Sequence, residues 1–308
     1  MTLSAAGILM VADRITTLLI LIAVGYLAFR LSILDRQATH KLSLFLLHVT
    51  IPALIIVSMQ IPSSPELLSG AVVFCLAIGV FYLLAATVAY IGTLLLRMED
   101  RERGVFSFAI LFGNVGFMGF PIAETLFGAA SLFYVALGNL VFNLLVFSAG
   151  IVMMTGRYEF NPRLLINPGI AASYIGLTLF LLGVRIPSPL FDAMELTGNL
   201  TTPLAMIIVG SLLATFPAKE MIGDLKTYLA TGLRLIVLPA AIYLLLAPLI
   251  PDPLVLGVVV ILAAMPVAST TAIFAEIYGG DERFASRLVF ISMISSIISI
   301  PLIGAFLI

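Results

Sequence analysis

The feature that most constrains this chain is a series of long apolar runs that recur from one end to the other. Most exceed the 18 residues that a helix needs to cross a hydrocarbon core of ~30 Å. Apolar residues make up 62% of the 308 positions and charged residues only 10%, whereas a soluble domain carries roughly 25% charged residues. Too few charges remain to cover a water-exposed surface. We therefore predict an all-α polytopic membrane protein.

Interruptions of the apolar pattern divide the chain into ten expected spans. Only helices satisfy every backbone group within lipid, unless a barrel closes, and these segments are too long and uniformly apolar for barrel strands. The spans are expected at roughly 5–30, 41–60, 67–96, 104–127, 130–155, 163–183, 189–215, 221–249, 253–278 and 284–307.

Basic residues gather on alternate connections between these spans. The even-numbered connections hold only Arg185, and Arg14 and Arg234 lie within or near spans. By the positive-inside rule, the side that carries the odd-numbered connections, which are rich in basic residues, is cytoplasmic. Both termini are then expected on the non-cytoplasmic side of the inner membrane. The odd-numbered connections hold twelve of the fifteen basic residues: Arg30, Arg36, Lys41, Arg97, Arg101, Arg103, Arg157, Arg163, Lys219, Lys226, Arg283 and Arg287.

The chain resembles itself at an offset of about 151 residues. At this offset Gly25 falls on Gly176, and with one more residue Glu124 falls on Glu276. The shared offset predicts two five-helix repeats, residues 1–155 and 156–308. Because five is odd, the second repeat enters the membrane inverted. Inverted repeats characterise secondary transporters, whose substrate site lies near the midplane between the repeats.

Spans four and nine contain matching interruptions. Residues 113–121 hold three glycines, an asparagine and a proline, and residues 265–271 hold Pro266 followed by three hydroxyl side chains. Such clusters oppose helix continuity, and paired breaks point to a transporter's binding site. The start of a helix offers unpaired N–H groups and a partial positive charge, so two such ends attract an anion. The freed carbonyls could instead hold a cation or water.

The two interrupted segments resemble the auxin efflux carrier family. Residues 113–121 with Gly128 are similar to its Asn-x-x-x-x-Gly-x-Pro signature, and residues 264–266 and 274–281 to its second segment. The family includes plant PIN auxin carriers and bacterial carriers of malonate, malate and similar acids. Plant members have proline where this chain has Gly113, and further glycine and proline where it has Ala268 and Thr271. These departures favour the bacterial organic-acid branch.

The resemblance implies ten spans in two inverted repeats, with broken helices four and nine crossing each other. It also implies a scaffold of spans one, two, six and seven, and a mobile transport domain of spans three to five and eight to ten. The substrate then sits beside the crossing and is carried by an elevator-like movement. Carried over by position, Asn114 and Pro266 mark the two breaks.

The polar residues near the expected crossing are the candidates for binding the substrate. Asn139 and Asn143 lie four residues apart on one helical face, and either face the crossing or bond a neighbouring helix. One or two of the hydroxyls at 269–271 are expected to face the site. The candidates are Asn114, Gly113, Gly116, Pro266, Ser269, Thr270, Asn139 and Asn143.

Four ionisable residues inside spans have both a structural and a functional interpretation. Glu124 and Glu276 lie about ten residues beyond the breaks, roughly 15 Å along the helix. They are either carboxylates near the interface or sites for a coupling proton or sodium ion. Arg234 either reaches the surface or pairs with a carboxylate, or it attracts the anionic substrate. For His48 a structural hydrogen bond is favoured over proton coupling.

We predict a secondary transporter of a small mono- or dicarboxylate with an elevator-type mechanism. The alternatives are a sodium-coupled carrier of the bile-acid symporter type and, less favoured, a passive channel. The chain has one cysteine, Cys75, and lacks the Gly-x-Ser-x-Gly and His-Glu-x-x-His motifs, so we expect neither an enzyme nor a metal site. A net charge of −1 does not suggest nucleic acid. The expected partners are the substrate and the bilayer; a homodimer stays open.

Overall fold

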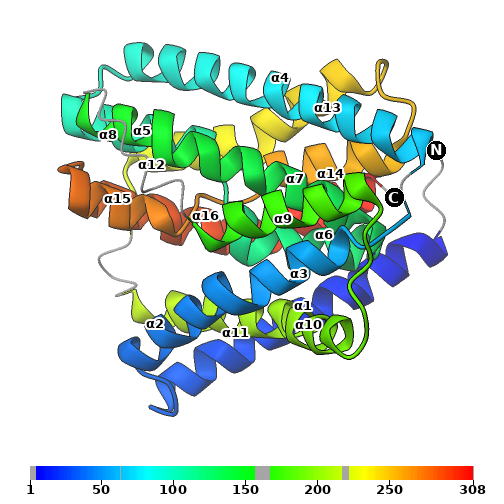
Figure 1. The fold of residues 1–308 in the computed structure, drawn as a ribbon. Coiled ribbons are helices and arrows are strands. Elements are labelled where there is room, and N and C mark those ends of the chain that lie inside the picture. Colours follow the sequence, from blue (N-terminus) through cyan, green and yellow to red (C-terminus); the bar gives the residue numbers. More distant parts are fainter. Residues whose placement is uncertain (1–4, 63, 157–166, 217–221, 308) are drawn as a thin grey trace.

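The computed structural model describes residues 5–62, 64–156, 167–216 and 222–307, and its secondary structure there is helical apart from one bridge between Gly113 and Val267 (Figure 1). The helical segments are α1 (Ala5–Arg30), α2 (Arg36–Phe45), η1 (Leu46–Thr50), α3 (Ile51–Ser58), α4 (Pro65–Leu95), α5 (Asp100–Leu111), η2 (Val115–Gly119), α6 (Phe120–Phe127), α7 (Ala130–Leu145), η3 (Val146–Gly150), α8 (Ile151–Thr155), α9 (Pro168–Leu182), α10 (Leu190–Asn199), α11 (Thr201–Thr215), α12 (Leu225–Gly232), η5 (Leu233–Val237), α13 (Leu238–Leu246), α14 (Pro253–Ala263), α15 (Thr270–Tyr278) and α16 (Glu282–Leu307).

Six helices in the described ranges are long and apolar enough to cross a membrane, and four shorter apolar helices accompany them. The bounds of the six long helices follow the expected ranges to within a few residues, whereas Val115–Phe127 and Pro253–Ala263 each cover only part of an expected range. The ranges expected to be interrupted do break, at residues 112–114 and 264–269. The second range begins earlier than expected, at Arg36, because Asp35 caps the helix there. Arg157, Arg163 and Lys219, three of the basic residues used for orientation, lie outside the described residues.

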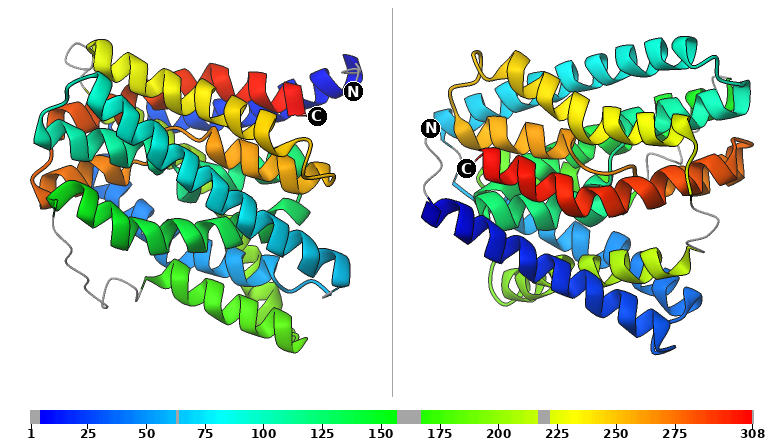
Figure 2. Two further views of the ribbon diagram at one scale, coloured as in Figure 1. Left: turned by 90° about the horizontal axis from the view of Figure 1, so that it is seen from above. Right: turned by 180° about the vertical axis from the view of Figure 1, so that it is seen from behind.

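The helices form two groups that pack side by side. In Figure 1, α1, α2, α3, α10 and α11 lie together below, α4, α5, α12 and α13 lie above, and α6, α7, α9, α15 and α16 lie between them. Both termini lie at the same end of the bundle in every view (Figures 1 and 2). We call α1, α2, α3, α9, α10 and α11 the lower group, since α9 packs closely on α3. The remaining helices, together with the breaks after α5 and α14, are the upper group.

Small residues bring helices of the lower group into very close contact. A Cβ on Gly25 of α1 would collide with the backbone of Ile207 in α11, and a Cβ on Gly176 of α9 would lie 3.4 Å from the Cα of Ile56 in α3. Glycine at such contacts lets apolar helices approach within dispersion range. These two contacts are related to one another by the same offset of about 151 residues that the sequence shows.

Three prolines sit just beyond widened turns inside their helices. The turns η1, η2 and η5 each end two residues before a proline: Pro52, Pro121 and Pro239. A proline lacks the N–H that would close the preceding turn, and its ring crowds the carbonyl four residues back. A wider π-type turn removes that crowding, and such turns are frequent at functional sites. His48, Asn114 and Arg234 all lie on or beside these turns.

Replacing Gly25 with alanine tests the close approach of α1 and α11. The added Cβ collides with the Ile207 carbonyl, so we expect a destabilisation of about 1–3 kcal/mol and a lower apparent unfolding midpoint in detergent. The matched control is Gly79→Ala in α4, where a Cβ meets nothing within 4 Å. The control should be neutral or slightly stabilising. Equal midpoints for the two variants would contradict the close contact.

Candidate functional site

The two broken helices cross at a short antiparallel backbone pairing. After α5 and α14 end, the N–H of Asn114 donates to the Pro266 carbonyl at 2.8 Å, and the N–H of Ala268 donates to the Phe112 carbonyl at 3.0 Å. The N–H of Val267, beside this pairing, donates to Ser292 Oγ of α16 at 3.0 Å. The unwound backbone is thus held by defined partners inside an apolar bundle, as buried backbone groups require.

Asn114 ties the two breaks together through its side chain. It caps the helix that begins at η2, because its Oδ1 accepts from the Phe117 N–H at 3.2 Å. Its Nδ2 donates to Ser269 Oγ, at the start of α15, at 3.3 Å. The residue is only 3% exposed. One amide therefore fixes the relative position of the two second half-helices.

A cavity of about 180 Å³ opens beside this crossing, between α7, α9 and η1. It has the space of about six waters at ~30 Å³ each. Apolar side chains such as Phe142 and Ile51 make up most of its lining, and no acidic side chain is among the lining residues. Its polar side chains are His48, Asn114, Asn139, Asn143, Asn167, Ser269 and Thr270.

Three helices begin at the wall of this cavity. They start after Asn114, after Ser269 and after Asn167, and all three residues line the space. The first N–H groups of a helix have no partner within the helix and carry a partial positive charge. In the absence of an acidic side chain in the lining, this charge makes the cavity suited to an anion.

Two polar side chains at the cavity have unused hydrogen-bonding capacity. Thr270 Oγ1 is buried without a hydrogen-bond partner among the described residues. Asn143 Nδ2 donates to the backbone carbonyl of Asn139 at 2.8 Å. Asn139 lines the cavity and is 4% exposed, and its side-chain amide has no hydrogen bond recorded within the described ranges. Buried polar groups are normally satisfied, so these groups are placed to bind a polar ligand.

The other predicted residues fall into three places. Gly113 and Gly116 line the cavity, whereas Pro266 contributes only its carbonyl to the backbone pairing. Glu124 is half-buried outside the cavity and accepts a hydrogen bond from Thr202 Oγ1 of α11 at 2.8 Å, which joins α6 to the lower group. Glu276 is exposed and also lies outside the cavity lining.

Arg234 has partners that differ from those expected. It is 1% exposed, so it does not reach the membrane surface. Its guanidinium donates to the backbone carbonyls of Met265 and Ile110 at 3.0 and 2.8 Å, rather than to a carboxylate. It does not line the cavity. A role in attracting the anion stays a prediction.

His48, Asn167 and Gly169 also line the cavity, although the sequence did not place them there. His48 makes the expected structural hydrogen bond, with its Nδ1 2.9 Å from the Leu44 carbonyl, but its ring also lines the cavity. Asn167 and Gly169 belong to the start of α9, where the Asn167 side chain accepts from the Gly169 N–H at 2.8 Å. The Asn-Pro pair at 167–168 is a recognisable helix start, yet nothing in it shows that it faces the cavity.

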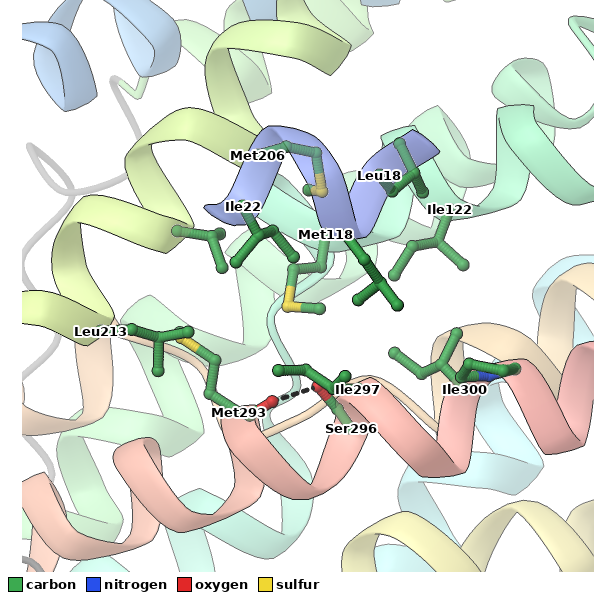
Figure 3. Close-up of a pocket in the computed structure, with 13 residues that line it drawn as sticks. Leu18, Ile22, Met118, Ile122, Met206, Leu213, Met293, Ser296, Ile297 and Ile300 are labelled. Atoms are coloured by element: carbon green, nitrogen blue, oxygen red, sulfur yellow. Dashed lines mark hydrogen bonds between the residues drawn. The ribbon is translucent and has the colours of Figure 1, made fainter. Parts of the chain in front are cut away.

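A second cavity lies between α1 and α11 on one side and α6 and α16 on the other (Figure 3). Its volume is about 30 Å³, one water's worth. Its walls are methionine, leucine, isoleucine and valine side chains, and the Ser296 hydroxyl there already donates to the Met293 carbonyl at 2.7 Å. This cavity has no free polar group for an anion. It marks an apolar contact between the two groups.

Comparisons with known proteins match nearly the whole chain. The model of a family described as "Membrane transport protein" matches residues 10–162 and 158–304. A protein of Rhizobium meliloti named "Putative malonate transporter" is 26% identical over 292 residues, covering 91% of this chain and 90% of that protein. An uncharacterized transporter of Methanocaldococcus jannaschii is 26% identical over 308 residues, covering 95% of this chain and 97% of that protein.

Thiol labelling tests whether the cavity at the crossing admits water. The natural cysteine, Cys75, is exposed and is first replaced by serine. We expect Thr270→Cys, at the cavity wall, to react with a water-soluble maleimide in detergent solution. The matched control is Thr271→Cys, because Thr271 is 0% exposed and does not line the cavity. Labelling of Thr270→Cys as slow as that of Thr271→Cys would show that water does not reach the cavity.

Proposed function

We propose, from the premise that this chain belongs to the membrane transport protein family, that it is a secondary transporter of a small mono- or dicarboxylate. The family match covers both interrupted segments, and it confirms the resemblance to the auxin efflux carrier family seen in the sequence. The family alone does not name a substrate. The substrate class is therefore inferred from the chemistry of the cavity.

The observation that carries the substrate class is the polarity of the cavity wall. Three helix starts meet at a space whose lining includes no acidic side chain, and Thr270 and Asn139 have free hydrogen-bonding groups there. A carboxylate accepts hydrogen bonds from N–H, amide and hydroxyl donors, and such charge-assisted bonds are stronger than neutral ones. The volume of about 180 Å³ favours an acid of a few carbons. One relative carries malonate in its name, which agrees with this size.

We further propose ten membrane spans in two inverted repeats. The support is the set of helix bounds, the two interrupted helices that cross, and the pair of glycine contacts related by the repeat offset. The even total of ten spans also agrees with the two termini lying at one end of the bundle (Figure 2).

An elevator-type movement of the upper group against the lower group would expose the cavity to each side in turn. The cavity lies where the groups meet, because its wall combines Leu47 and Gly169 with Asn114 and Asn139. Apart from the hydrogen bond between Glu124 and Thr202, the nearby contact between α1, α11, α6 and α16 is apolar. Sliding one surface over the other would therefore break few directional bonds, since dispersion attraction is nondirectional. In this proposal the lower group is the scaffold.

Uptake into proteoliposomes tests the transport function. Labelled malonate, malate, lactate and indole-acetate are offered separately, with sodium and proton gradients imposed one at a time. We expect uptake of at least one of the small acids. Asn114→Ala should reduce the initial rate about tenfold or more, because it removes both the helix cap and the link to Ser269. The matched control is Asn199→Ala, an exposed position at the end of α10 that lies outside the cavity lining.

If none of the acids is taken up under any gradient by a protein that is folded and correctly inserted, the organic-anion proposal is wrong. If uptake occurs but Asn114→Ala and Asn199→Ala behave alike, the transport function stands and the cavity at the crossing is not its site.

The pH dependence of the KM for lactate tests whether an ionisable residue near the cavity takes part in binding or coupling. His48 lines the cavity, whereas Glu124 and Glu276 lie outside it. His48→Gln should flatten this profile. Glu124→Gln and Glu276→Gln serve as parallel variants: a flattened profile in either of them, with His48→Gln unchanged, would assign the proton to that carboxylate instead.

A further inference from the structure

Arg234 lies at the convergence of the two first half-helices. Its Nε donates to the Met265 carbonyl at 3.0 Å, just beyond the end of α14. Its Nη1 donates to the Ile110 carbonyl at 2.8 Å and approaches that of Leu111 at 3.4 Å, in the last turn of α5. The last carbonyls of a helix have no partner within the helix. One guanidinium therefore satisfies carbonyls from both broken helices.

The charge of Arg234 is balanced by backbone dipoles. A helix carries roughly half a negative charge at its carboxyl end, and two such ends meet at this side chain. The ring of Phe81, on α4, faces the guanidinium at 5.4 Å and adds a cation–π contact. The salt bridges recorded within the described ranges involve Arg103 and Lys226, and neither includes Arg234. An unbalanced charge at 1% exposure would be very costly.

Gly113 is the residue that makes room for this arrangement. A Cβ placed on Gly113 would collide with Arg234 Nη2 and would lie 3.0 Å from the Met265 Cβ. Any other residue at position 113, proline included, carries that Cβ. The glycine before Asn114 and the arginine in η5 thus form a matched pair, although 121 positions separate them in the chain.

We propose that Arg234 is a built-in cation of the crossing, which neutralises the carboxyl ends of α5 and α14 and occupies the place that a coupled inorganic cation would need there. Sodium binds through oxygen ligands, and the carbonyls of Ile110, Leu111 and Met265 are already engaged. Arg234 is a positioning residue. It holds the first half-helices, α5 and α14, so that the amino ends of the second half-helices, which begin at η2 and α15, remain free at the cavity. The idea of a coupled cation rests on the proposed function, whereas the tests below measure stability alone.

The first test uses the unaltered protein in detergent without substrate. Its apparent unfolding midpoint is measured in sodium chloride and in choline chloride of equal ionic strength. Because the carbonyls are occupied, we expect the same midpoint in both salts. A higher midpoint in sodium, abolished by substitution at Ser269 or Asn114, would place a sodium ion at the crossing and overturn the proposal.

The second test removes the cation and returns it. Arg234→Ala should lower the midpoint by roughly 5–10 °C, because it leaves the carbonyls unpaired. Ethylguanidinium at non-denaturing concentration should restore much of that loss, and sodium should restore part of it, while choline should restore none. Arg234→Lys, which keeps the charge but not the planar fork, should fall between the two. Loss of stability with no response to ethylguanidinium or to sodium would mean that the residue only fills space, and would overturn the proposal.

The close contact between Gly113 and Arg234 provides a measurement that does not need Arg234→Ala, which is useful if that variant expresses poorly. Gly113→Ala should be strongly destabilising beside Arg234 and much less so beside the shorter side chain of Arg234→Met. Additive effects of the two substitutions would contradict the pairing. None of these unfolding midpoints involves a substrate. The proposal about Arg234 can therefore be wrong while uptake occurs, and uptake can be absent while the midpoints behave as expected.

Discussion

The structure depends on one requirement: a helix broken inside an apolar bundle must find partners for the backbone groups it releases. In lipid an unsatisfied N–H or carbonyl costs several kcal/mol. Here the backbone N–H groups of Asn114 and Ala268 pair the two breaks with each other. Arg234 donates hydrogen bonds to backbone carbonyls at the ends of α5 and α14. The carboxyl ends are therefore satisfied by the protein itself. The amino ends remain at the cavity, where their partial positive charge supports the proposed binding of an anion.

The parts of this fold that the sequence predicts are those that depend on local pattern. Apolar runs and capping residues place the helices, and the glycine and proline clusters place the breaks at 112–114 and 264–269. The hydroxyls of Ser269 and Thr270 and the amides of Asn139 and Asn143 do line the cavity. Asn139 and Asn143 could be selected because they lie four residues apart on one helical face, and Ser269 and Thr270 because they follow the break at Pro266.

The partners of Arg234 could not be predicted from the sequence. They are backbone carbonyls of residues more than 30 and more than 120 positions away, and a carbonyl has no side-chain identity for a pattern to detect. The same limit applies to His48 and Asn167, since the cavity wall forms only when the two groups meet. A signal was present nonetheless: the glycine at 113, where plant relatives of the resembled family have proline, removes the Cβ that the guanidinium would strike.

The division of charge at the crossing also bears on how the proposed movement keeps its site intact. Arg234, Phe81, Ile110 and Met265 all belong to the upper group, so in the proposed movement the cation would travel with both broken helices. A mobile inorganic ion at the same place would have to bind and leave in each cycle, and the half-helices would lose their common anchor each time. A covalently attached cation cannot leave. Coupling, if the transporter uses it, must therefore act through groups that meet the other side of the cavity or the boundary with the lower group, where His48 and the Glu124–Thr202 hydrogen bond lie.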